Sequence, residues 1–459
     1  MTGGIIMKLI KEILRLAIPS IATFSSMTVT GLLILMIIGK LGATAIAVVG
    51  ITNVLMYNLW ALFSGNQGAI NYLVAQNYGS RNMKLGNQRM QIALILAALQ
   101  AILLFVSSYV IPHFILEIMG SNAAILQLGV PYVQVRMLAM MFTVFNIIFY
   151  AYMRATGDTR TPMNISLINS ALVVLLTYAL AYGKFGFPNL GLQGAGWSMV
   201  AAEGITFLLN LLVYFRFLNE KYFTRSWIPI ERHQVRLLLF ESSKLGITEL
   251  SNSMGMLVFT ACITRLGTVA IAANEIALNI LSFGFMPANG FGAASTVGIG
   301  QEIGKGRPLE AKRFGLVTVY LGLGFMLLIS TILFVFALPV AKLYTADSAV
   351  YLTSVSLIHL ASFILLFSGS GIILAGGLRG VGDTTFLSRA SLLLNWIFFV
   401  PCTILLTQVY HLGQTGAWTA FCSLIIFQCA ANAWRFKALD WTLAKSKSSH
   451  IKQSKSVNA

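Results

Sequence analysis

The chain has 459 residues, of which 57% are hydrophobic and only 10% are Asp, Glu, Lys or Arg. A soluble globular protein carries about 25% charged residues, so this composition excludes a soluble domain of this length and indicates apolar surface covered by lipid. The formal net charge is +17, but the basic residues lie in short segments between apolar runs, an arrangement that reflects membrane topology and excludes a nucleic-acid-binding surface.

Twelve apolar segments follow one another along the chain. A membrane-spanning helix needs about 20 apolar residues. The segments do not alternate in polarity as barrel strands do, so helices are expected. The first half is predicted to span at 13–37, 44–69, 90–111, 124–152, 162–183 and 192–216. The second half is predicted to span at 238–264, 269–296, 314–338, 349–377, 386–408 and 414–436.

Lysine and arginine are concentrated in alternate connections, which predicts a cell-membrane protein with both termini in the cytoplasm. The longest polar break indicates a cytoplasmic linker at 217–237, between bundles of six helices at 1–216 and 238–437. Residues 438–459 form a basic tail, which we expect to be cytoplasmic and disordered. The four cysteines lie in apolar stretches without ligand spacing, so neither a metal site nor a disulfide framework is predicted.

The two halves resemble each other at one fixed offset of 225 residues. The matched pairs include Gly42 and Gly267, Gly65 and Gly290, Gln76 and Gln301, Gly79 and Gly304, and Asp158 and Asp383. Each half contains an even number of predicted spans, so the repeats are parallel and related by an axis along the membrane normal. This architecture favours a transporter with alternating access over a channel or a scaffold.

Several motifs resemble the multidrug and toxic compound extrusion (MATE) transporters. They are Gly39-Lys40-Leu41-Gly42, Val74-Ala75-Gln76-Asn77-Tyr78-Gly79 with its partner Gly300-Gln301-Glu302-Ile303-Gly304, and the duplicated Arg154–Thr159 and Arg379–Thr384 segments. The resemblance implies a V-shaped pair of six-helix bundles that exports organic cations and drugs, driven by inward flow of protons or sodium ions. No cofactor beyond that coupling ion is implied. The sequence shows no cluster of histidines, nucleophile elbow or phosphate-binding loop, so no enzyme is predicted.

Three carboxylates fall well inside predicted spans, away from their ends, where an unpaired charge is costly and therefore points to function. Glu203 binds a proton or cation, or only bonds to a neighbour, and the sequence favours neither. Glu275 belongs to one repeat only, which favours coupling over a hydrogen bond between helices. Glu249 lies in a span where relatives similar to NorM carry a functional glutamate, and the alternative is an ion pair with Lys244.

Two aspartates occupy equivalent positions of the repeat, in the Gly-Asp-Thr segments. For Asp158 we expect a helix-capping role, because Asp is a good N-cap residue. Asp383 is a further coupling candidate, since the resemblance places it near a position linked with cation binding in NorM-like members.

Four residues are predicted to line a substrate cavity: Arg136, Met141, Phe145 and Tyr57. Methionine is adaptable and aromatic rings attract cations, which suits a promiscuous cavity. The arginine could instead pair with a carboxylate or hold an anionic substrate. The alternative for each of the other three is helix packing or contact with lipid.

The chain departs from the family pattern at two positions. Ile34 and Thr177 stand where many relatives carry aspartates, so coupling through the first half must use Glu203, or else the second half supplies it. The leading hypothesis is a monomeric antiporter with a small-molecule substrate. The alternative is a lipid-linked saccharide flippase of the same superfamily, which the twelve spans and the single mid-span arginine disfavour.

Overall fold

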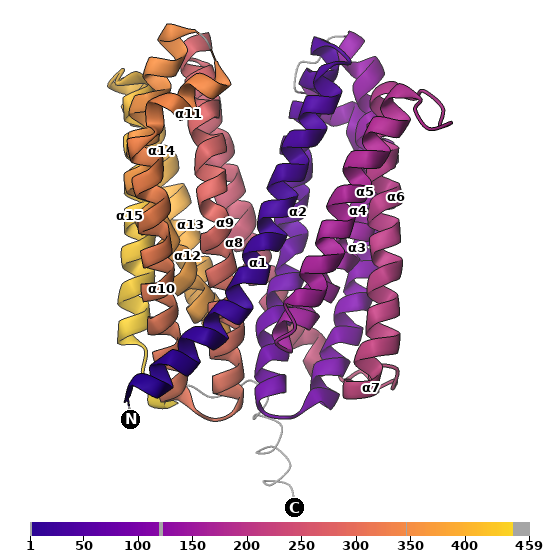
Figure 1. The fold of residues 1–459 in the computed structure, drawn as a ribbon, viewed down its shortest axis with the longest axis vertical. Coiled ribbons are helices and arrows are strands. Elements are labelled where there is room, and N and C mark those ends of the chain that lie inside the picture. The colour runs from indigo at the N-terminus through magenta and orange to yellow at the C-terminus, as the bar shows by residue number, and fades with distance from the viewer. Residues whose placement is uncertain (1, 119–122, 346, 444–459) are drawn as a thin grey trace, which may run out of the picture. The chain divides into compact units, whose positions relative to one another are not determined.

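The computed structural model describes residues 2–118, 123–345 and 347–443, and all regular secondary structure within these residues is helical (Figure 1). The helices of the first half are α1 (Thr2–Gly39), α2 (Ala43–Gly79), α3 (Met83–Ile118), α4 (Ala123–Ala155), α5 (Arg160–Tyr182) and α6 (Gly191–Leu212). A π-helical turn η1 (Val213–Phe217) and the short α7 (Leu218–Tyr222) continue α6. The first half therefore contains six long helices, as predicted.

The second half repeats this order. Its helices are α8 (Arg232–Thr264), α9 (Thr268–Gly304), α10 (Pro308–Val335), the short α11 (Ala337–Tyr344) and α12 (Ser348–Val381). They are followed by α13 (Thr384–Leu392), which runs through η2 (Leu393–Phe399), α14 (Val400–Ile404) and η3 (Leu405–Val409) without a break. The last elements are α15 (Gly413–Ala438) and the single turn η4 (Trp441–Leu443). Most of the predicted basic tail, residues 444–459, lies outside the described residues.

Eleven helices of the described chain are long and apolar enough to cross a membrane. The helix at the place of the predicted seventh span, α8, has 33 residues, or about 50 Å at 1.5 Å per residue, but is less apolar because it carries Glu241, Lys244 and Glu249. The helices begin earlier and end later than predicted, as α3 does against 90–111. A span predicted from hydropathy stops at the polar residues near the helix ends. The backbone groups of these residues still form helical hydrogen bonds, so the helices are longer than the predicted spans.

Two compact units make up the fold. Unit 1 contains residues 1–24, 75–81 and 247–459, and unit 2 contains residues 25–74 and 82–246. Unit 1 therefore combines most of the second half with the beginning of α1 and the end of α2, and unit 2 combines most of the first half with the beginning of α8. The chain passes from one unit to the other within the helices α1, α2 and α8, and also in the loop between α2 and α3.

Close helix packing explains why these helix beginnings are exchanged. In unit 1, a Cβ atom added at Gly290 of α9 would overlap Ile21 of α1. In unit 2, a Cβ atom added at Gly65 of α2 would overlap the backbone of α8 at Ser242 and Gly246. Gly65 and Gly290 are equivalent positions of the repeat, and small residues let helix backbones approach closely.

Backbone conformation follows the repeat as well. Gly42 and Gly267 end the first loop of each half with φ of +111° and +106°. Gly157 and Gly382 precede the fifth helix of each half with φ of +88° and +95°. Side chains other than glycine rarely adopt these conformations, so the matched glycines are required by the same turn in both halves.

Candidate functional site

Glu203 lies inside unit 2, on α6, and amide side chains from two other helices hold its carboxylate. Asn146 of α4 donates from Nδ2 to Oε2 at 2.8 Å, and Asn169 of α5 donates from Nδ2 to Oε1 at 3.0 Å. Asn146 Nδ2 is also 3.1 Å from the Glu203 backbone oxygen. Both carboxylate oxygens are therefore bound by neutral donors from different helices.

Further oxygen atoms surround this group. Asn210 of α6 donates from Nδ2 to Asn146 Oδ1 at 2.9 Å, which extends the network by one more residue. Among the described residues, three buried oxygens of this region accept no hydrogen bond: Asn169 Oδ1, Thr206 Oγ1 and Asn210 Oδ1. Small hard cations prefer oxygen ligands. A carboxylate with spare oxygen acceptors nearby can take up either a proton or such a cation.

Arg136 lies on α4, ten residues before Asn146. Its Nη1 donates to Asn53 Oδ1 at 3.3 Å and to Tyr132 Oη at 3.2 Å. No direct ion pair joins Arg136 to Glu203, but the two charges interact favourably. Arg136 therefore adds positive potential to the carboxylate without neutralising it by contact.

Glu249 forms a different kind of contact, within unit 1. Its Oε1 lies 3.7 Å from Arg379 Nη2 of α12, and both side chains are about 30% exposed (32% and 28%). The alternative of an ion pair with Lys244 is wrong, because Lys244 Nζ lies 2.8 Å from Glu241 Oε1. Lys244 is three residues from Glu241 and five from Glu249, and a spacing of three or four residues brings side chains together on a helix.

The two repeat-related aspartates have different partners. Asp158 accepts a hydrogen bond at Oδ1 from the Thr161 backbone N–H at 3.0 Å, which confirms the expected capping role. Asp383 caps no helix with its side chain, and instead its Oδ2 lies 2.6 Å from Arg435 Nε of α15. The sequence repeat therefore does not extend to the environment of this carboxylate.

Glu275 lies on an exposed face of α9, with no hydrogen bond or ion pair to its carboxylate among the described residues. Its neighbour Asn274 is buried and accepts a hydrogen bond from Trp418 Nε1 at 3.1 Å. The four coupling candidates do not form one site within a unit: Glu203 belongs to unit 2, and Glu249, Glu275 and Asp383 belong to unit 1.

The predicted cavity residues come from two helices of unit 2: Tyr57 from α2, and Arg136, Met141 and Phe145 from α4. Tyr57 is 55% exposed and stacks on Trp60 at 5.8 Å, and Met141 is half-buried. Phe145 packs at 5.2 Å against Phe207, a residue that sequence reasoning did not single out. Phe207 also contacts the rings of Phe142 and Phe149, so it is the centre of an aromatic cluster between α4 and α6. The role of these residues in substrate binding stays a prediction.

Sequence reasoning missed the amide residues around Glu203: Asn146, Asn169 and Asn210. A signal for them was available, because each is a strongly polar side chain within an apolar span, where polar groups mark contacts between helices or function. Their convergence on one carboxylate depends on the packing of α4, α5 and α6.

The MatE family model matches two stretches of the chain, residues 19–179 and 245–405. A relative from Thermotoga maritima, described as probable multidrug resistance protein NorM, is 25% identical over 94% of this chain and 93% of its own length. Multidrug resistance protein PmpM of Pseudomonas aeruginosa is 25% identical over 88% of this chain and 84% of its own length.

Solved structures have the same fold. A mutant of the Vibrio cholerae MATE transporter VcmN superposes with a TM-score of 0.87 at 18% identity, covering 95% of this chain and 99% of that one. A MOP superfamily transporter from Pyrococcus furiosus superposes with a TM-score of 0.85 at 20% identity, covering 93% and 96%. The predicted all-helical membrane fold built from two repeats is thereby confirmed. The duplicated match and this shared fold establish that the chain belongs to the MATE transporter family, and that it is a multi-pass membrane transport protein and not an enzyme.

Proposed function

We propose that this protein exports small organic compounds, cationic or amphipathic in character, by antiport against protons or sodium ions. The description of its relatives as multidrug resistance proteins supports the substrate class. The two-repeat transporter fold supports alternating access. The distribution of lysine and arginine supports insertion in the cell membrane with both termini in the cytoplasm. We further propose that the protein acts as a monomer.

Glu203 is the coupling residue in this proposal. The observation that carries it is the pair of neutral donors: Asn146 and Asn169 bind the carboxylate, and no cationic side chain of the described residues forms an ion pair with it. An ionised carboxylate within a membrane span is costly. Binding a proton or a cation there removes that cost, so the ion can shift the balance between two conformations of the protein.

The two departures from the family pattern support this assignment. Ile34 is buried and apolar, so it supplies no ion ligand. Thr177 is engaged with Ser198, whose Oγ lies 2.6 Å from Thr177 Oγ1. Neither position holds a carboxylate, which leaves Glu203 as the acidic residue available inside the spans of the first half.

The test is transport by purified protein reconstituted in liposomes, with a fluorescent organic cation and with proton and sodium gradients imposed separately. We expect one gradient to drive dye movement in the unaltered protein. Glu203→Gln should lower the rate of dye movement at least about tenfold, which corresponds to a free-energy change of ~1.4 kcal/mol or more. Glu275→Gln is the matched control, because it removes an intramembrane carboxylate that has no hydrogen bond or ion pair among the described residues, and it should retain most of the rate.

Three outcomes would contradict the proposal in different ways. Unchanged gradient-driven transport in Glu203→Gln would remove the coupling role from this residue, and loss of transport in Glu249→Gln would move that role to unit 1. No dye movement under either gradient would argue against drug antiport and would favour a lipid-linked saccharide flippase.

A further inference from the structure

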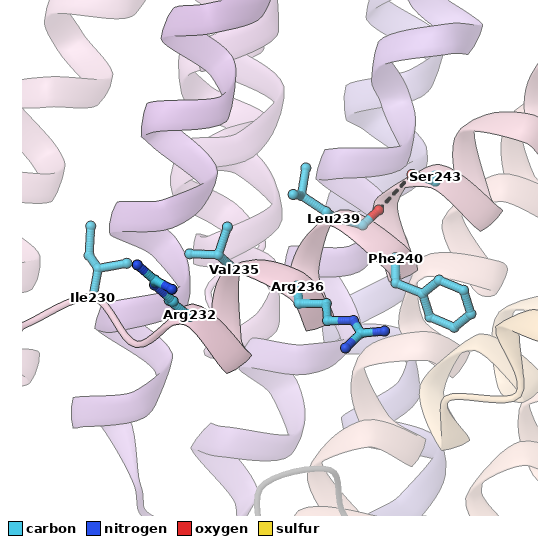
Figure 2. Close-up of a pocket in the computed structure, with 7 residues that line it drawn as sticks. All are labelled: Ile230, Arg232, Val235, Arg236, Leu239, Phe240 and Ser243. Atoms are coloured by element: carbon cyan, nitrogen blue, oxygen red, sulfur yellow. Dashed lines mark hydrogen bonds between the residues drawn. The ribbon is translucent and has the colours of Figure 1, made fainter.

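A cavity of about 510 Å³ lies at the beginning of α8, where the linker between the halves enters this helix (Figure 2). All of its lining residues belong to unit 2. They are Ile230, Arg232, Val235, Arg236, Leu239, Phe240 and Ser243. Two cationic side chains and four large apolar ones therefore share one surface.

The cations of this cavity are not neutralised by the protein. Arg232 and Arg236 are one helical turn apart and exposed, and neither pairs with a carboxylate within the described part of the chain. The nearest acids in the sequence are Glu231, which is exposed, and Glu241, which is buried and paired with Lys244. The cavity therefore presents a surplus of positive charge.

The segment that leads into the cavity has a fixed structure. Three side chains of α3 bind its backbone oxygens: Asn87 binds Tyr222 at 2.7 Å, Gln88 binds Pro229 at 2.5 Å and Gln91 binds Ser226 at 2.7 Å. Linker residues 223–231 are thus held on unit 2 by side-chain hydrogen bonds.

Large apolar side chains are exposed on and beside this segment. Phe223 and Trp227 are each 71% exposed, and Phe240 is 60% exposed. Exposed tryptophan next to arginines is typical of the membrane–water interface, because the indole ring is apolar but carries one polar N–H group. Trp227 and the two arginines of the cavity therefore fit a position at the level of lipid headgroups.

We propose that this cavity binds an anionic phospholipid. The phosphate is held by Arg232 and Arg236, because guanidinium groups bind phosphate oxygens in a fixed fork geometry. An acyl chain lies along Val235, Leu239 and Phe240. A soluble anion would not contact these apolar side chains, whereas a phospholipid can bind the arginines with its phosphate and the apolar side chains with its acyl chain. Basic pockets on the cytoplasmic side of other membrane proteins bind lipid headgroups in this way.

Lipid retention by the full-length protein tests this proposal. Protein exchanged into nanodiscs of mixed phosphatidylglycerol and phosphatidylcholine is released in a mass spectrometer, and the bound lipids are counted. We expect the unaltered protein to retain phosphatidylglycerol preferentially. The double variant Arg232→Gln/Arg236→Gln should lose about 25-fold of this preference, at about fivefold for each arginine near an anionic surface.

The matched control is Arg307→Gln/Lys312→Gln, which removes the same charge from the beginning of α10 in unit 1 and should keep the preference. Leu239→Ser tests the apolar part and should weaken retention without any change of charge. An unchanged preference in the arginine double variant, or an equal loss in the control, overturns the proposal. So does a thermal stabilisation of the unaltered protein by glycerol phosphate equal to that by phosphatidylglycerol, because the acyl chain would then contribute nothing.

The experiment is independent of transport. A protein that fails to move any dye can still retain phosphatidylglycerol at this site, and a protein that couples drug export to an ion gradient can still lack the lipid preference. Failure of the lipid site and failure of the antiport proposal are therefore distinguishable.

Discussion

At the scale of single residues, chemically identical side chains have different roles because their partners differ. Glu203 and Glu275 are both carboxylates within apolar spans, yet only Glu203 is held by amides from other helices. Asp158 and Asp383 occupy equivalent positions of the repeat, yet one caps a helix and the other contacts an arginine. Their residue types could be read from the sequence, whereas their partners could not.

The contact between Asp383 and Arg435 predicts a structural role for this aspartate. Both side chains are partly exposed, at 15% and 35%, so solvent screens the pair and its contribution is about 1–2 kcal/mol, between those of exposed and buried pairs. Asp383→Asn should lower the melting temperature of the detergent-solubilised protein and leave gradient-driven transport largely intact. Fluorescence-monitored melting and the liposome assay measure the two effects.

The matched variant for this prediction is Arg435→Gln, which should destabilise the protein by a similar amount, and the double variant should cost little more than either single change. Loss of transport in Asp383→Asn with unchanged melting would instead return Asp383 to the list of coupling residues.

At the scale of elements, the ends of α2 and α9 approach each other reciprocally within unit 1. A Cβ atom added at Gly79 would overlap the Gln301 carbonyl oxygen, and one added at Gly304 would overlap the Gln76 carbonyl oxygen. These four residues form two pairs of the 225-residue repeat. Gln76 Nε2 also donates to the Gly380 carbonyl oxygen at 3.0 Å, which ties the end of α2 to α12.

Gly79→Ala should therefore destabilise the protein. The added methyl group would meet backbone atoms of Gln301, which cannot rotate away as a side chain can. We therefore expect the free energy of unfolding to fall by about 1–3 kcal/mol and the melting temperature to fall with it. Gly50→Ala is the control, since a Cβ atom at Gly50 meets nothing within 4 Å. Alanine is the better helix former by about 1 kcal/mol, so this control should melt at the same temperature or higher. Equal destabilisation by both substitutions would show that the close approach is not required.

At the scale of the whole molecule, the linker is not the place where the chain divides into units. Residues 217–237 were predicted to separate the bundles, and in the structure they include α7 and the segment fixed on α3. The passage from unit 2 to unit 1 comes later, after Gly246 within α8. The first helix of each half begins on the other half, because matched glycines on α2 and α9 provide the packing surface.

Fragments of the chain test this exchange. Residues 1–226 lack the beginning of α8 that packs over Gly65, so this fragment alone should be aggregated in detergent. Residues 1–246 include that segment and should be more monodisperse by size-exclusion chromatography. Fragments 1–226 and 227–459 should co-purify when expressed together. If 1–226 behaves as well as 1–246, the beginning of α8 is not an essential part of unit 2.

The sequence by itself determined the membrane class, the positions of the spans and the parallel repeat. Transfer of each segment into lipid depends on its own composition. The repeat is preserved in the residues themselves, down to matched glycines in the connections between corresponding helices. It also identified Glu203, Glu249 and Glu275 as costly charges that need an explanation.

Only the tertiary structure decided what surrounds those charges and which helices share a unit. The partners of Glu203 come from α4 and α5, more than 30 residues away along the chain, and α8 joins unit 2 through contacts with α2. Hydropathy is a property of one segment and its solvent. A hydrogen bond or close helix approach depends on the distance between two segments, which is fixed only when the helices pack.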